Sequence, residues 1–149
     1  MAMELDYNRS IYGHEYQAGP FELTAEMVQA YTNSIGDTNP ISCDGAAAKT
    51  AGFRGIVAPP TICTMFVRQV KLPSIDLKFG NMRFHAGQRV QSKAPIIAGD
   101  SLSASSHLKD VYAKTGRSGT MVFTVWETTF SNQDGEVVAD VQESFAARE

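Results

Sequence analysis

The chain has 149 residues, of which 43% are apolar and 19% charged, and its formal net charge is −3. This length fits one domain with its own core. The sequence lacks the basic, aromatic-rich clusters typical of nucleic-acid-binding proteins. The polar start, MAMELDYNRS, lacks the apolar segment of a signal peptide, and no apolar run is long enough to span a bilayer. We therefore expect a single cytoplasmic domain over residues 1–149, with no nucleic-acid or membrane partner.

Two helices are predicted in the first third of the chain. Residues 24–36 read TAEMVQAYTNSIG, in which Thr24 is a suitable N-cap and Gly36 a suitable C-terminal stop. Apolar residues recur at helical spacing between them. A short second helix is predicted in the segment GAAAKTAG, with Asp44 as its cap.

The strongest helical pattern covers residues 60–72. A proline fits the first turn, where its missing N–H is not needed, and Pro73 ends the helix. Its predicted apolar stripe consists of Ile62, Met65, Phe66 and Val70.

From residue 77 onward apolar residues recur with a period of two, which predicts strands. Four segments carry this pattern: RFHAGQRVQ, SLSASSHLKDVY, TMVFTVWETTF and EVVADVQESF. The third is apolar on both faces, as a central strand would be. The intervening segments KTGRSG and NQDG predict tight turns.

The alternation also assigns side chains to the two faces of the sheet. In the first strand it separates Phe84, Ala86 and Val90 from Arg83, His85 and Arg89. In the second it separates Leu102, Ala104, Leu108 and Tyr112 from Ser101, Ser103, Ser105, His107 and Lys109. In the last it groups Val137, Ala139, Val141 and Phe145.

One long helix followed by about four antiparallel strands predicts an α+β domain. A sheet with one apolar face would bury that face by curling around the helix at residues 60–72. Such a sheet leaves an edge strand, and many proteins cover an edge by pairing with a second chain. We therefore expect a dimer.

The segment YTNSIGDTNPISCD contains the first candidate for chemistry. Its Gly-Asp-x-Asn-Pro run forms a tight turn at a helix end, which could aim the Asp37 carboxylate into a cleft and let Asn39 orient it. The same residue types are also the commonest turn formers. Spacing alone leaves both interpretations open.

Other catalytic groups are hard to find in the sequence. His14, His85 and His107 are each best explained as solvated or structural, and none shows the spacing of a metal site. The only cysteines, Cys43 and Cys63, form neither a disulfide framework nor a CxxC pair. Nucleotide-binding loops and a GxSxG motif are absent. No metal and no cofactor are therefore predicted.

The segment YTNSIGDTNPISCDGAAAKTAGFRGIVAPPT resembles the hydratase segment of MaoC-like proteins, the (R)-specific enoyl-thioester hydratases and 3-hydroxyacyl dehydratases. The closer likeness is to the branch that resembles the N-terminal dehydratase-like domain of type I fatty acid synthases. The later AGD turn and the hairpin segments VYAKTGRSG and DGEVVA follow in the order of that branch. The likeness covers nearly the whole chain.

The resemblance implies a hotdog fold, in which a curled antiparallel sheet wraps one long central helix. It implies an acyl substrate held as a thioester of CoA or of acyl carrier protein, and water added or removed across its α,β bond. The implied catalytic residues are Asp37 and Asn39. The implied substrate-binding residues, at the head of the central helix, are Val57, Ala58, Pro59, Pro60 and Thr61.

Two positions depart from the active members of that family. Their loop reads Gly-Asp-x-Asn-Pro-Ile-His, but here Ser42 stands where the histidine would be. A hydroxyl cannot shuttle a proton at neutral pH as imidazole does. Their central helix begins with a His-Gly pair whose glycine N–H polarises the thioester, whereas this chain has Ala58-Pro59-Pro60, and proline has no N–H.

These departures favour a subunit that binds the acyl thioester beside a histidine-bearing hotdog partner. One alternative is a self-sufficient hydratase in which Asp37 works with another base, such as His85, within the chain or across a homodimer. A second is a non-catalytic acyl-thioester-binding module. A thioesterase is less favoured, because hotdog thioesterases usually carry a carboxylate on the central helix and TICTMFVRQVKL has none.

Overall fold

The computed structural model describes residues 3–149. Its sheet contains five antiparallel strands in the order β1-β5-β6-β7-β3. Their bounds are β1 Tyr16–Glu22, β3 Met82–Ser92, β5 Ser101–Gly116, β6 Gly119–Ser131 and β7 Val137–Arg148. A two-stranded ribbon pairs β2 (Val57–Ala58) with β4 (Ile96–Ile97).

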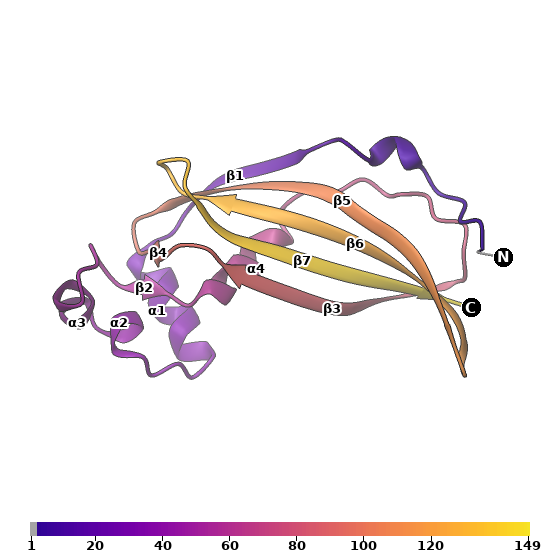
Figure 1. The fold of residues 1–149 in the computed structure, drawn as a ribbon. Helices are drawn as coiled ribbons and strands as arrows, with labels where there is room; N and C mark the ends of the chain where they lie inside the picture. The colour runs from indigo at the N-terminus through magenta and orange to yellow at the C-terminus, as the bar shows by residue number, and fades with distance from the viewer. Residues whose placement is uncertain (1–2) are drawn as a thin grey trace.

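The helices are short and lie on one side of the sheet. They are η1 Arg9–Ile11, α1 Ala25–Ser34, α2 Pro40–Cys43, α3 Gly45–Thr50, η2 Pro60–Cys63 and α4 Thr64–Val67. Figure 1 shows the sheet curling in front of α4, with α1, α2 and α3 gathered at one end and both chain termini at the other. The curled antiparallel sheet around a helix, expected from the resemblance, is present.

The helix caps predicted in the first third of the chain are confirmed. The Thr24 hydroxyl accepts a hydrogen bond from the Met27 N–H at the start of α1. Gly36 follows the helix with φ +70°, a left-handed conformation that glycine adopts without steric cost. The Asp44 carboxylate accepts from the Ala46 N–H at the start of α3.

The predicted helix over residues 60–72 is too long. A 3₁₀ turn over Pro60–Cys63 leads into α4, which ends at Val67. Ile62 and Phe66 are buried as expected, but Met65 is 42% exposed. The chain then runs in an irregular path in which Ile75 is buried and Leu77 and Phe79 pack beneath the sheet.

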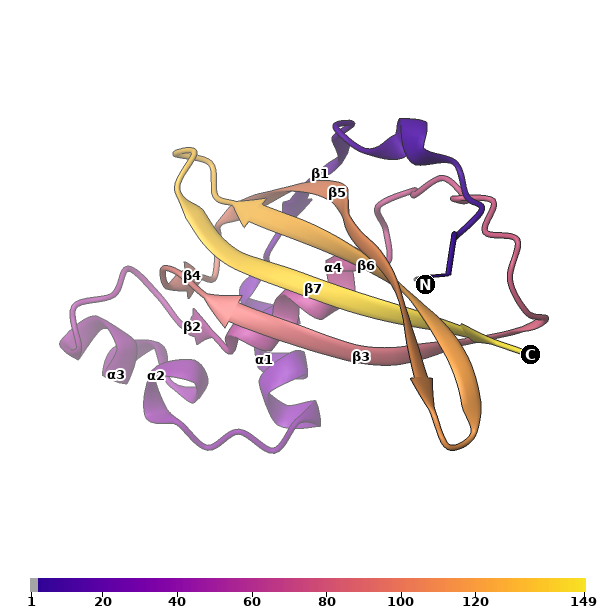
Figure 2. The ribbon, with the colours of Figure 1, turned by 45° about the vertical axis from the view of Figure 1, so that its right-hand side comes forward.

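The concave face of the sheet is therefore covered in two parts. The part near α4 includes Ile62, Phe66, Leu102, Phe130 and Val141. The second part packs Trp126 and Val122 against Ile11 and Ile75, which come from the N-terminal segment and the loop before β3. Figure 2 shows these two segments beside the half of the sheet that lies away from α1, α2 and α3.

Register shifts correct the predicted faces of three strands. On β7 the shift beside Ser131 turns Val137, which is 41% exposed, away from the face of Ala139 and Val141. The register shifts between His85 and Gly87 on β3, so Phe84 faces outward while Val90 faces the concave side with Val141. The predicted grouping of Phe84, Ala86 and Val90 is wrong for this reason. An extra residue in a strand inverts the alternation on one side of the bulge.

A second bulge lies between Leu108 and Asp110 on β5. Val111 is consequently buried in the concave core, whereas Tyr112 faces outward and stacks on Phe123 with ring centroids 5.2 Å apart. The prediction that Tyr112 shares the face of Leu102 is therefore also wrong. The strand β1, which pairs with β5 at an edge, was not predicted at all.

Candidate active site

The segment from Gly36 to Ser42 forms a rigid turn between α1 and α2. The Asp37 N–H donates to the Thr32 carbonyl at 3.1 Å, and the Asp37 Oδ1 accepts from the Asn39 N–H at 2.9 Å. The Asn39 side chain in turn caps α2 by accepting from the Ile41 N–H at 3.4 Å. These short-range bonds explain why this sequence turns sharply here, and they fix the direction of the Asp37 side chain.

A cleft of about 410 Å³ opens beside this turn. It is lined by Asp37, Asn39, Ile41, Ser42, Phe53, Val57, Ala58, Pro59, Pro60 and the segment 92–96. The volume lies in the range of small-molecule sites, which combine apolar walls with a few polar groups. A hollow of about 300 Å³ beside β1 and β5 is lined by Gln17, three serines, two alanines, one threonine and one glycine, and none of these lining side chains is titratable. The cleft beside Asp37 is therefore the better candidate.

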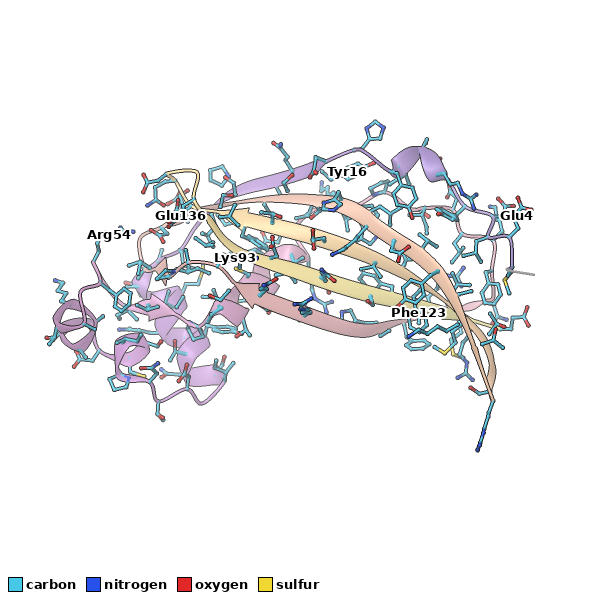
Figure 3. All side chains as sticks on the ribbon, viewed as in Figure 1. Glu4, Tyr16, Arg54, Lys93, Phe123 and Glu136 are labelled. Carbon is cyan, nitrogen blue, oxygen red and sulfur yellow. The ribbon has the colours of Figure 1, made fainter. Side chains whose placement is uncertain are left out.

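The wall of the cleft is fastened by a buried carboxylate. Asp100 is fully buried and accepts hydrogen bonds from Arg54 Nη2 at 2.7 Å, the Ile97 N–H at 2.9 Å and Gln133 Nε2 at 3.1 Å. Burial raises the pKa of Asp100, but these bonds outweigh it, so the net pKa lies below its ordinary value. Figure 3 shows Arg54 beyond the end of the sheet, near the hairpin that carries Glu136.

Asp100 holds together three segments that surround the ribbon of β2 and β4. Arg54 precedes β2, Ile97 belongs to β4, and Gln133 lies in the β6–β7 hairpin. The Ala98 N–H also donates to the Ile56 carbonyl at 2.9 Å. Because Val57 and Ile96 line the cleft, this network fixes the spacing between two of its walls.

Among the residues that the structure describes, the lining of the cleft includes the Asp37 carboxylate but no imidazole. Ser42 is 4% exposed and lies in the cleft wall at the position where the resemblance expects histidine. Among residues 3–149 the Asp37 carboxylate accepts a single hydrogen bond, from the Asn39 N–H. At the head of the helix, Pro59 and Pro60 line the same cleft and supply no N–H.

All three histidines lie away from this turn. His14 is exposed near the N-terminus. His107 lies on the outer face of β5, 3.7 Å from the carboxylates of Glu15 and Glu127. His85 Nε2 lies 2.9 Å from Glu143 Oε2, on the concave face of β3 and β7. Sequence reasoning missed Glu143 as a buried residue of that face. The available signal was its position two residues after Val141, because alternate residues of a strand share a face.

Most of the predicted site residues come together in this cleft. Asp37, Asn39, Ser42 and the segment from Val57 to Pro60 all line it. Thr61 does not; its Oγ1 accepts a hydrogen bond from the Tyr31 hydroxyl at 2.7 Å. Sequence reasoning missed Phe53 and the segment 92–96, whose only signal was the irregular SKAP stretch after β3.

The five-stranded curled sheet, the short helix within it and the Gly-Asp-x-Asn-Pro turn beside that helix define a hotdog-fold protein of the hydratase and dehydratase type. The family described as the FAS1-like dehydratase domain region matches residues 10–141, and the chain belongs to this family. A similar curated relative is a UPF0336 protein of Parafrankia sp., 34% identical over 95% of this chain and 94% of its own length.

Solved structures share this fold. The HadBC (3R-hydroxyacyl-ACP dehydratase) complex from Mycobacterium tuberculosis gives a TM-score of 0.77 at 22% identity, covering 94% of this chain and 99% of that one. An (R)-hydratase from A. caviae involved in PHA biosynthesis gives 0.68 at 18% identity, covering 93% and 96%. The ChsH1–ChsH2 complex from M. tuberculosis gives 0.65 at 21% identity, covering 91% and 83%. In residues 3–149 every helix is too short or too polar to cross a bilayer.

Proposed function

We propose that this chain is the acyl-thioester-binding subunit of an enoyl-thioester hydratase or 3-hydroxyacyl-thioester dehydratase, and that a hotdog partner supplies the catalytic histidine. The observation that carries this proposal is the composition of the cleft. Asp37 and Asn39 are held in a rigid turn at its edge, but Ser42 stands where the resemblance expects the imidazole, and Pro59 stands where it expects the glycine N–H.

Hydration of an enoyl thioester needs two proton transfers. A base removes a proton from water as the oxygen bonds to the β-carbon, and an acid delivers a proton to the α-carbon. Negative charge collects meanwhile on the thioester oxygen, which needs N–H donors. The cleft offers one carboxylate for this work, and its first helical residue with an N–H is Thr61.

The apolar lining of the cleft suits the other task, that of holding the acyl group. Ile41, Phe53, Val57, Ala58 and Ile96 surround the position between Asp37 and the helix head. Burial of methylenes against such a wall favours binding by about 0.8 kcal/mol for each CH₂. Binding without the full proton relay is what a partner-dependent subunit requires.

Two of the similar structures support a division between subunits. The HadBC and ChsH1–ChsH2 structures are each of a complex. In this chain the edge strand β3 has no neighbour on one side within the described residues, and an unpaired edge is a natural place for a second sheet to join.

The first test is to follow hydration of enoyl-CoA and enoyl-carrier-protein substrates by the purified chain, alone and with candidate hotdog partners that carry the histidine motif. We expect saturable binding of the thioester by the lone chain and turnover only with a partner. Efficient turnover by the lone chain would instead support the self-sufficient hydratase. Binding without turnover by any partner would support the non-catalytic module.

A second test rebuilds the missing groups. In the Ser42→His variant an imidazole enters the cleft beside Asp37, and we expect hydration by the lone chain to become measurable. Adding Pro59→Gly restores an N–H at the helix head and should raise the rate about 100-fold further, the typical value of one oxyanion donor. Ser118→His, in the exposed β5–β6 turn, is the matched control. Folded variants that bind substrate but show no gain would contradict the proposed role of this cleft.

A further inference from the structure

The strand β3 presents a long unpartnered edge. It pairs with β7 on one side only, and in residues 3–149 no strand lies on its other side. Nine of its eleven residues are exposed, the two exceptions being Gly87 and Val90. Figure 1 shows β3 as the lower border of the sheet, at the edge opposite β1. The free N–H and C=O groups of such an edge favour pairing with another strand.

The side chains of this edge carry positive charge only. The strand reads MRFHAGQRVQS, with two arginines, one histidine and no carboxylate. The Arg83 guanidinium reaches only the backbone carbonyls of Met82 and Leu77, at 3.4 Å and 3.3 Å. Within residues 3–149 no carboxylate oxygen lies within 4.0 Å of a side-chain nitrogen of Arg83 or Arg89.

The bulge in β3 distributes this charge over both faces of the sheet. Arg83 lies opposite Ala147 and shares the concave face with His85. Beyond the bulge, Arg89 lies opposite Gln142 on the outer face. The nearby carboxylate of Glu143 is hydrogen-bonded to His85 Nε2 at 2.9 Å and to Gln88 Nε2 at 3.4 Å, and forms no ion pair with either arginine. A strand that joined this edge would therefore meet an uncompensated arginine on each face.

Charge of one sign disfavours pairing between two copies of this chain. A joint between two β3 strands would bring four arginines together without a carboxylate on either strand. Like charges across a strand pair are destabilising, and opposite charges are favourable. The apolar residues Met82 and Phe84 are 48% and 39% exposed. Any joining strand would bury them, so they do not favour a different subunit over a second copy of this chain.

We propose that the β3 edge selects an acidic edge strand of a different hotdog subunit and disfavours a second copy of this chain. The proposal rests on the proposed function, because that function requires a partner. It adds what the partner must present: carboxylates on both faces of the joining strand, positioned to meet Arg83 and Arg89. The same charge that recruits the partner reduces the competing homodimer.

The test reverses the edge charge and needs no knowledge of the natural partner. The double variant Arg83→Glu/Arg89→Glu is mixed with the wild-type chain, and association is measured by sedimentation and by a labelled-copy binding assay. We expect the mixture to associate about tenfold more tightly than either protein alone at about 0.02 M salt, with the preference shrinking at about 0.5 M. The single variant Arg89→Glu, which leaves the Arg83 contacts with Leu77 intact, should show a smaller preference of the same sign.

The matched control is Lys49→Glu/Arg117→Glu, which makes the same change in net charge on α3 and in the β5–β6 turn. It should associate with the wild-type chain no better than the wild-type chain with itself. A wild-type homodimer as tight as the mixture, or a mixture that does not associate, would overturn the charge selection. Neither result would affect the hydration assays of the lone chain, so the two proposals fail separately.

Discussion

Asp100 gives the sharpest prediction about stability, because its carboxylate is fully buried and accepts three hydrogen bonds. In Asp100→Asn the amide oxygen can still accept from the Ile97 N–H, but its NH₂ group then faces two other donors, Arg54 and Gln133. An unsatisfied buried donor or a lost charge-assisted bond costs about 1–3 kcal/mol. We expect a loss of about 2 kcal/mol in the free energy of unfolding, which lowers Tm by about 4–8 °C.

The partner of this carboxylate should matter much less. The Arg54 side chain is 63% exposed, so after Arg54→Ala water can replace the guanidinium as a donor to Asp100 Oδ1, and the Ile97 and Gln133 donors remain. Asp100→Asn, by contrast, leaves a buried NH₂ group facing two other donors. Urea unfolding of both variants beside the wild type provides the comparison. If Arg54→Ala cost as much as Asp100→Asn, the buried hydrogen bonds would not be the main source of stability here.

The sign of the pH dependence follows from the lowered pKa of Asp100. A depressed folded-state pKa contributes stability that is complete above the unfolded value of about 3.9 and is lost as the pH falls through the folded value. Asp100→Asn lacks this contribution. The difference between wild type and variant should therefore be constant near neutral pH and narrow below about pH 4. A gap of constant size into acid would refute the assignment.

Two further predictions concern single residues. Burial raises the pKa of the Cys63 thiol to about 12, whereas Cys43 is exposed, so a thiol reagent at pH 8 should modify Cys43 rapidly and Cys63 only after unfolding; rapid modification of the Cys43→Ser variant would contradict this. A Cβ at Gly19 would lie 2.8 Å from the Leu102 carbonyl oxygen, while one at Gly36 would meet nothing within 4 Å. Both have positive φ, so in urea unfolding Gly36→Ala should cost about 1 kcal/mol and Gly19→Ala clearly more.

The parts of the fold that were predicted correctly depend on local signals. The caps at Thr24 and Asp44 and the hairpin turns are set by residues close in sequence. The central place of β6 followed from its apolar character on both faces. The resemblance predicted the curled sheet. It also predicted a shared site for the Asp37 turn and the Ala58–Pro60 segment, and both line one cleft.

The missed features depend on contacts between distant segments. The strand β1 is short and forms its pairs with β5, 88 residues later in the chain by the register Gln17 to Ser105. The helix α4 ends at Val67 rather than at residue 72, and the irregular segment after it packs Leu72 and Ile75 under the sheet, through contacts with distant strands. The pairing of His85 with Glu143 depends on a bulge, which strict alternation cannot anticipate.

The extra residue in β3 has a consequence for how this protein can change over time. Because the strand reverses its alternation at Ala86, loss of a single residue there would turn either Val90 out of the core or Phe84 into it. It would also move one arginine to the other surface of the sheet. Single substitutions in this strand are therefore tolerated more easily than a deletion or an insertion at Ala86. A change of length would reverse which residues face the core and which face each surface of the sheet.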